Sequence, residues 1–134
     1  MMASTTQLNT PGRALAELGA VHALTDVTGF GLLGHLLEMC RAAGLAASLD
    51  LAAIPLLPGV QALAQAGHVT GASQRNWAAY AEQVALDAPM TPVQRALLTD
   101  PQTSGGLLLY LVAKRRVNVT LLLGGLATRS RAFR

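Results

Sequence analysis

Residues 24–35 read LTDVTGFGLLGH and constrain the fold of this chain more than any other segment. Gly29, Gly31 and Gly34 separate a short strand-like stretch from a run of leucines at helical spacing. This order predicts a strand, a tight turn and a helix in direct succession. The helix is expected to begin at Gly31 and to end before Gly44, because glycine readily takes the left-handed conformation that closes helices.

Asp26 stands at the end of the expected strand, between Thr25 and Thr28 and just ahead of the glycines. Backbone N–H groups and the dipole at a helix start favour anions, and a nearby carboxylate can hold the accompanying cation. Mg²⁺ usually takes one or two carboxylates together with phosphate oxygens and water. The turn therefore suits a metal–phosphate ligand, with Asp26 supplying one oxygen but not the whole site. The alternative is that Asp26 only caps the helix.

The run GFGLLG over residues 29–34 also matches the glycine fingerprint of dinucleotide-binding sites, with Asp50 at the end of the next expected strand. Two features oppose that interpretation. The residues before the glycines are polar and acidic, and Asp26 would repel a diphosphate unless a cation lay between them. The repeated strand–helix units of such a domain do not follow.

A second unusual block, DPQTSGG, spans residues 100–106. The backbone amides of Ser104, Gly105 and Gly106 can cradle an anion. A plain turn from loop to strand explains the same glycines at least as well. The block is therefore a candidate second part of the site.

The three histidines do not form a metal-binding constellation. His35 and His22 could both approach the turn, although hydrogen-bonded core or surface roles explain them more simply. His68 has no evident partner. Cys40 is the single cysteine, which excludes an intrachain disulfide, and its apolar helical surroundings predict a buried, inert thiol.

Short helices mixed with few strands indicate an α+β fold. Helices are expected over residues 11–18, 31–43, 59–66, part of 71–83 and 92–98, and strands over 21–27, 45–51 and 107–112. The hydrophobic share of 51% and charged share of 13% fit a compact soluble domain. We find neither a leader pattern nor an apolar run long enough to span a bilayer, so a cytoplasmic location is expected.

Charge is distributed unevenly along the chain. All seven acidic residues lie at or before Asp100, whereas residues 111–134 carry six lysines and arginines and no acid. A basic tail can bind nucleic acid or anionic lipid. The charges are spread over the tail and aromatic residues are few, so we expect neither nucleic acid nor a membrane as partner.

The segment TDVTGFGLLGHLLEM (25–39), followed by DPQTSGGLL (100–108), resembles the selenophosphate synthetases, also called selenide, water dikinases. The connecting segments AIPLLPGV (53–60) and RNWAAY (75–80) agree, and the likeness runs over about residues 8–109. That family makes selenophosphate from selenide, ATP and water, releasing AMP and phosphate. The resemblance implies the C-terminal α+β domain shared with aminoimidazole ribonucleotide synthetase, a mixed sheet with flanking helices.

The resemblance also implies roles for individual residues. Asp26 would be the one Mg²⁺ ligand that the C-terminal domain contributes to the ATP site. The residues near the ATP phosphates would be Thr25, Thr28, Gly29 and Gly31, and the second motif would comprise Asp100, Thr103, Ser104, Gly105 and Gly106. The family's other magnesium aspartates, its catalytic cysteine or selenocysteine and its essential lysine belong to an N-terminal domain that is not in this chain, so no catalytic residue is assigned.

Mg²⁺ and ATP are accordingly expected only together with that N-terminal ATP-binding domain, and the chain alone is expected to be inactive. A homodimer is a second candidate assembly. Two other functions stay open from the sequence. One is a non-catalytic module that docks onto a separately encoded N-terminal half, and the other is a dinucleotide-binding domain.

After Leu109 the chain departs from the family, which would continue with an acidic helix and a further strand. Residues 1–109 are interpreted as the domain and residues 110–134 as a divergent basic tail produced by a shifted reading frame. On this interpretation the sheet lacks its last strands, which would leave an unpaired edge.

Overall fold

The computed structural model describes residues 5–113, 116–123 and 126–133, with residues 112 onward described through their backbone only. Its strands form one sheet in the order β1-β3-β4-β5-β2. They are β1 (Val21–Asp26), β2 (Ala46–Ala47), β3 (Leu107–Ala113), β4 (Arg116–Leu123) and β5 (Leu126–Phe133). The helices are α2 (Pro11–Ala16), α3 (Gly31–Ala43), α4 (Val60–Gln65), α5 (Gly71–Tyr80) and α6 (Pro92–Thr99), with 3₁₀ turns at Leu51–Ala53 and Ala81–Gln83. The expected α+β class is confirmed.

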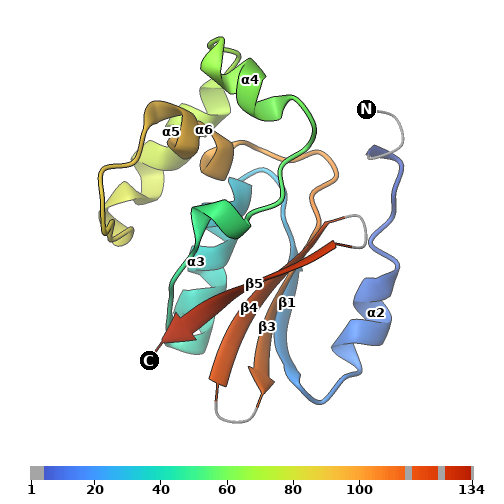
Figure 1. Cartoon of the computed structure of the whole chain (residues 1–134). Helices are drawn as coiled ribbons and strands as arrows, with labels where there is room; N and C mark the ends of the chain where they lie inside the picture. Colours follow the sequence, from blue (N-terminus) through green and yellow to red (C-terminus); the bar gives the residue numbers. More distant parts are fainter. Residues whose placement is uncertain (1–4, 114–115, 124–125, 134) are drawn as a thin grey trace.

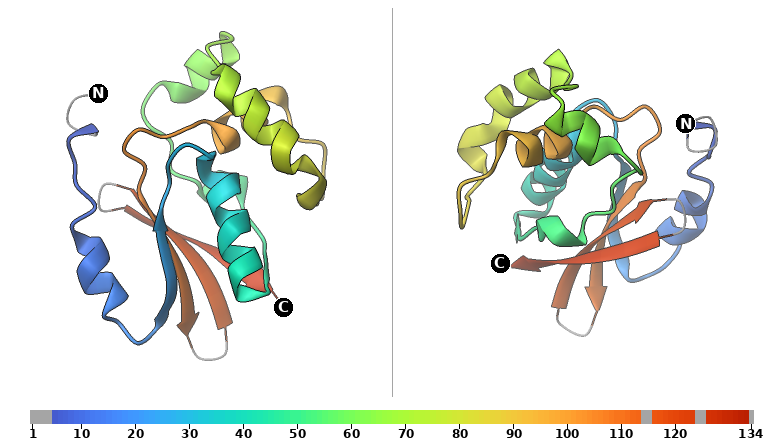
Figure 2. Two further views of the ribbon diagram at one scale, coloured as in Figure 1. Left: turned by 180° about the vertical axis from the view of Figure 1, so that it is seen from behind. Right: turned by 45° about the horizontal axis from the view of Figure 1, so that its top comes forward.

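The helices lie on both sides of this sheet. Helices α3 to α6 gather on one side, and α2 lies beside β1 on the other (Figures 1 and 2). Each pair of neighbouring described strands is antiparallel, where the family resemblance implied a mixed sheet. None of the described helices is long and apolar enough to cross a membrane.

The C-terminal segment continues the sheet. Strand β4 pairs with the whole of β3, from Leu107 to Ala113, and β5 pairs with β4. The expectation of an unpaired edge at β3 is therefore wrong, because the alternating apolar residues of the tail form strands that cover it. That a shifted reading frame produced residues 110–134 stays a prediction. The expected basic tail also stays a prediction, because its lysine and arginine side chains lie outside the described residues.

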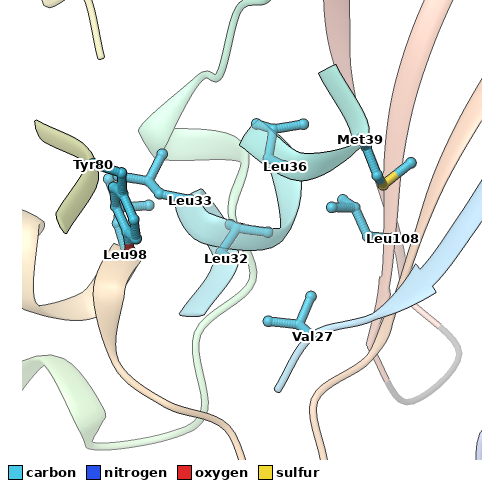
Figure 3. Close-up of a cluster of buried hydrophobic side chains, with 8 residues drawn as sticks. All are labelled: Val27, Leu32, Leu33, Leu36, Met39, Tyr80, Leu98 and Leu108. Atoms are coloured by element: carbon cyan, nitrogen blue, oxygen red, sulfur yellow. The ribbon is translucent and has the colours of Figure 1, made fainter. Parts of the chain in front are cut away.

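The main core forms where α3 packs onto the sheet (Figure 3). Its buried members are Val27, Leu32, Leu33, Leu36, Met39, Tyr80, Leu98 and Leu108. The four α3 residues lie between Leu98 and Tyr80 on one side and, on the other, Leu108 of β3 and Val27, which directly follows β1. Leu108 is 1% exposed, which fits the prediction of a buried strand after the second motif.

Several predicted element boundaries are confirmed by specific contacts. Gly44 closes α3 with a φ of +64°. Thr91 and Gln94 form a reciprocal capping box at the start of α6. The strand expected over residues 45–51 shrinks to β2, because Asp50 accepts a hydrogen bond from the Ala52 amide and starts a 3₁₀ turn instead.

Candidate functional site

Asp26 is the last residue of β1 and is exposed to solvent. It pairs with Leu107 of β3, so its side chain shares the face of the sheet on which α2 packs. Within the part of the chain that the structure describes, its carboxylate has no hydrogen-bond or ion-pair partner. A carboxylate held at a strand end without a protein partner is available to a cation.

The alternative that Asp26 caps α3 is wrong. Phe30 occupies the N-cap position of that helix, and no side chain caps it. Gly31 begins the helix with a φ of +69°, and a Cβ atom there would lie 2.6 Å from the carbonyl carbon of Thr99. The glycine is therefore required both by its backbone conformation and by the close approach of α6.

The two sequence motifs meet in space. The Val27 amide donates to the carbonyl oxygen of Gly106 at 3.0 Å, and the Gln102 amide donates to that of Thr28 at 3.0 Å. Gly105 packs so closely that a Cβ there would lie 1.9 Å from the Val27 carbonyl oxygen. The buried glycines of the second motif thus have a packing role, and their role as an anion cradle stays a prediction.

The other residues of the second motif bind neighbouring segments. Asp100 accepts a hydrogen bond from the Thr70 hydroxyl at 3.0 Å, next to the start of α5. Ser104 donates to the Thr5 carbonyl oxygen at 2.8 Å, and Thr103 is exposed beside it. The loop is therefore anchored both to α5 and to the N-terminal segment.

Three consecutive residues of the glycine-rich turn are each held by a helix side chain. The ring nitrogen Nε2 of His35 lies 3.0 Å from the Thr28 hydroxyl. The side-chain amide of Asn76 donates to the Gly29 carbonyl oxygen at 2.9 Å. The Tyr80 hydroxyl donates to the Phe30 carbonyl oxygen, also at 2.9 Å.

Asn76 and Tyr80 were not among the predicted site residues. From the sequence both appear only within the RNWAAY segment that agrees with the family. Their spacing of four residues within the RNWAAY segment, which places both on one helix face, is the signal that could have found them.

Only one of the two histidines expected near the turn reaches it. His35 is buried and contacts the Thr28 hydroxyl through Nε2, so it is a hydrogen-bonded core residue that also holds the turn, and its Nδ1 lies 3.5 Å from the Glu38 carboxylate. His22 contacts the Tyr110 ring edge-on at a centroid distance of 5.9 Å, four residues from Asp26 along β1. The idea that His22 approaches the site is wrong, because four strand residues span about 13 Å.

The described residues contain no group of three or more His, Cys, Asp or Glu side chains placed to hold a metal ion. Asp26 is a hard oxygen donor of the type that Mg²⁺ prefers, so it fits such an ion as one ligand. Further ligands would have to come from phosphate, water or another polypeptide segment.

Cys40 lies in α3, beside a small apolar cavity that it lines together with Met39, Tyr110 and neighbouring aliphatic side chains. The thiol is half-buried, and burial raises its pKa above the usual value. The full burial predicted for this thiol is therefore not confirmed, but the raised pKa keeps it protonated at neutral pH, as expected of an inert thiol.

Residues 4–124 match the family described as AIR synthase related protein, C-terminal domain. Three relatives are each named selenide, water dikinase. The protein of Pseudomonas straminea is 65% identical over 108 residues, that of Burkholderia pseudomallei 63% and that of Dechloromonas aromatica 56% over the same length. The alignments cover 81% of this chain but only 30–31% of each relative.

Proposed function

The chain belongs to the AIR synthase related proteins through their C-terminal domain, and on that premise we propose that it works as part of an ATP-dependent selenophosphate synthetase. In this role it contributes the Asp26 carboxylate to Mg²⁺–ATP, while another polypeptide segment provides the remaining nucleotide and metal contacts. The relatives' name supports the reaction: selenide, ATP and water yield selenophosphate, AMP and phosphate.

The exposed and unpartnered carboxylate of Asp26 is the observation that carries this proposal. The turn that follows it is fixed by hydrogen bonds to the second motif and to the helices, so the carboxylate starts from a rigid strand end. Rigid placement matters because a metal ligand held in position loses little freedom on binding. A single ligand also agrees with a chain that spans about 30% of its relatives' length.

The glycine-rich turn would lie next to the ATP phosphates. Gly29 is exposed, and a Cβ atom there would meet nothing within 4 Å, so a phosphate can approach the backbone at this point. Thr25 and Thr28 would contribute through their backbone, because the Thr25 side chain lies on the opposite face of β1 from Asp26 and the Thr28 hydroxyl contacts His35. When bound, Mg²⁺ would neutralise charge on the phosphate oxygens during phosphoryl transfer. Asp26 would hold that ion, and the turn would set its position.

The chain alone is not expected to turn over ATP. Phosphoryl transfer depends on several metal and phosphate contacts acting together. One carboxylate and one turn supply only a fraction of them. A partner that carries the N-terminal ATP-binding part, whether fused or separate, is therefore required.

The test is a chimera that joins the N-terminal part of the Pseudomonas straminea relative to this chain. AMP formation from ATP and selenide is measured over a range of Mg²⁺ concentrations. The chimera is expected to form AMP, and Asp26→Asn is expected to raise the Mg²⁺ concentration for half-maximal rate at least about tenfold, because the variant lacks a charged ligand. Asp87→Asn changes another exposed aspartate and is expected to have no effect.

Three results would overturn the proposal. One is a parent chimera that forms no AMP. Another is an unchanged Mg²⁺ dependence in the Asp26→Asn chimera. The third is AMP formation by the chain without any N-terminal part. Adding that part as a separate polypeptide tests the docking alternative with the same assay.

The structure does not favour the dinucleotide-binding alternative. A dinucleotide site needs parallel strands joined through a helix, whereas among the described strands β1 pairs only with the antiparallel β3. Asp50, which would have bound the ribose, caps a 3₁₀ turn.

A further inference from the structure

Helix α5 contacts the glycine-rich turn through one pair of polar side chains. Asn76 and Tyr80 are four residues apart and therefore lie on the same face of the helix. They donate hydrogen bonds of 2.9 Å to two consecutive carbonyl oxygens, those of Gly29 and Phe30. One helix face thus fixes two successive peptide planes of the turn.

Asn76 also joins the two motifs. The amide group of its side chain donates to the Thr99 carbonyl oxygen at 2.9 Å, directly before the second motif begins at Asp100. One amide group therefore bridges the turn after β1 and the end of α6. Moving α5 would shift both motifs together.

The Tyr80 hydroxyl is placed to donate its hydrogen bond over the whole physiological pH range. It is 7% exposed, and a Cβ atom at Gly34 would lie 3.2 Å from its ring, so the ring packs closely on α3. Burial raises the pKa of Tyr80 to about 12, although a backbone hydrogen bond at Gly34 partly opposes this effect. The hydroxyl therefore remains protonated, and able to donate, at any physiological pH.

We propose that Asn76 and Tyr80 are positioning residues that hold the glycine-rich turn in one place relative to the Asp26 carboxylate, so that both face the same metal–phosphate ligand. This inference rests on the proposed function for its metal, but its structural part concerns the turn alone. Neither side chain needs to touch the metal or the nucleotide. Both act by holding the backbone that follows Asp26.

The turn requires such fixing because of its composition. Gly29 and Gly31 permit many backbone conformations, and ordering one residue costs about 1–2 kcal/mol of conformational entropy. Asp26 itself is held by the pairing of β1 with β3. With the two carbonyl oxygens released, the turn would sample conformations that no longer face the same ion and phosphate as the Asp26 carboxylate. Metal affinity would then fall even though Asp26 itself is intact.

The first test uses the 134-residue chain by itself. Amide hydrogen exchange is followed by NMR at Gly31 and Gln102, whose amides both donate to the Thr28 carbonyl oxygen. Asn76→Ala and Tyr80→Phe are expected to accelerate exchange at both amides about five- to tenfold, which corresponds to the loss of one hydrogen bond. Tyr80→Phe keeps the ring and so preserves the packing if Asn76→Ala fails to fold.

Ser73→Ala is the matched control. Ser73 lies on the same helix, but its hydroxyl contacts α6, at 2.6 Å from the Thr99 hydroxyl. The control weakens the α5–α6 contact without releasing a carbonyl oxygen of the turn. The proposal is overturned if exchange at Gly31 and Gln102 rises no more in the two test variants than in Ser73→Ala.

The second test uses the chimera described above. Asn76→Ala and Tyr80→Phe are expected to raise the Mg²⁺ concentration for half-maximal rate several-fold, with a smaller change in the rate at saturating Mg²⁺. Ser73→Ala is expected to leave that concentration unchanged. An unchanged Mg²⁺ dependence in both test variants overturns the positioning role. A parent chimera that forms no AMP contradicts the proposed function instead, and amide exchange then decides whether the pair fixes the turn.

Discussion

A Cβ atom at residue 105 would lie 1.9 Å from the carbonyl oxygen of Val27. The next residue, Gly106, accepts a hydrogen bond from the Val27 amide at 3.0 Å. The backbones of the two motifs are therefore in direct contact, and the second motif requires glycine at this point for steric reasons.

Gly105→Ala is accordingly expected to be strongly destabilising. The methyl group must displace backbone atoms, because the nearest atom belongs to the backbone and not to a flexible side chain. The free energy of unfolding should therefore fall by about 3 kcal/mol, the upper end of the range for overpacked sites. Urea unfolding followed by circular dichroism measures it. Gly19→Ala is the control, since a Cβ there meets nothing within 4 Å. Equal stability of the two variants would contradict the close packing.

The start of α6 allows a second prediction. The Thr91 hydroxyl accepts a hydrogen bond from the Gln94 amide, and the Gln94 side chain accepts one from the Thr91 amide. Thr91→Ala removes the cap and is expected to cost about 1 kcal/mol of unfolding free energy. Thr91→Ser keeps the oxygen and should recover most of the loss in the same unfolding assay. A Thr91→Ser variant as unstable as Thr91→Ala would argue against the cap.

Local signals explain why part of this fold could be predicted. The helix from Gly31 to its end at Gly44, and the start of the helix expected over residues 92–98, depend on neighbouring residues, and both are confirmed. The extent of β2 was overestimated because Asp50 forms a competing turn. The partner of Asn76 is the carbonyl oxygen of Gly29, which lies 47 positions away, so no local pattern reveals the contact.

The candidate site also combines features that the local sequence predicts with features that depend on distant contacts. Asp26 and the two motifs could be found from the sequence, because glycines and an acidic residue stand out in an apolar chain. Their contact depends on β1 pairing with β3, which brings together segments about 80 residues apart. The antiparallel direction of that pairing was not predicted, since it is set by the chain path through the four intervening helices α3 to α6.

Because of Tyr80, the free energy of unfolding should depend on pH in the alkaline range. An unfolded tyrosine loses its proton near pH 10, whereas burial raises the pKa of Tyr80 to about 12. Between these values the folded chain binds more protons than the unfolded chain, so the free energy of unfolding falls as pH rises. The stabilisation is complete below pH 10, and about 2 kcal/mol of it should be lost by pH 12.

Tyr80→Phe isolates this contribution. The variant is expected to be less stable than the parent chain near neutral pH, by about 1 kcal/mol for the lost hydrogen bond. The difference should shrink, and then reverse, as pH rises from 10 to 12. Urea unfolding at several pH values measures both curves, and parallel curves across that range would contradict a buried, protonated Tyr80.

Asp26 gives the last prediction, which separates a ligand from a structural residue. Its carboxylate is exposed, does not cap α3 and has no ion-pair partner among the residues that the structure describes. Asp26→Asn should therefore change the unfolding free energy of the isolated chain by less than about 0.5 kcal/mol, as is usual for exposed positions.

Millimolar Mg²⁺ should stabilise the parent chain by a similarly small amount, because one carboxylate binds the ion weakly and stabilisation follows the ratio of ligand concentration to dissociation constant. Thermal unfolding with and without Mg²⁺ measures both effects. A large loss of stability in Asp26→Asn would mean that the carboxylate has a structural partner, and a large gain from Mg²⁺ would mean that this chain holds a complete metal site by itself. Small values for both, combined with a strong effect of the same substitution in the chimera, are the result expected of a ligand that acts only when the rest of the site is supplied.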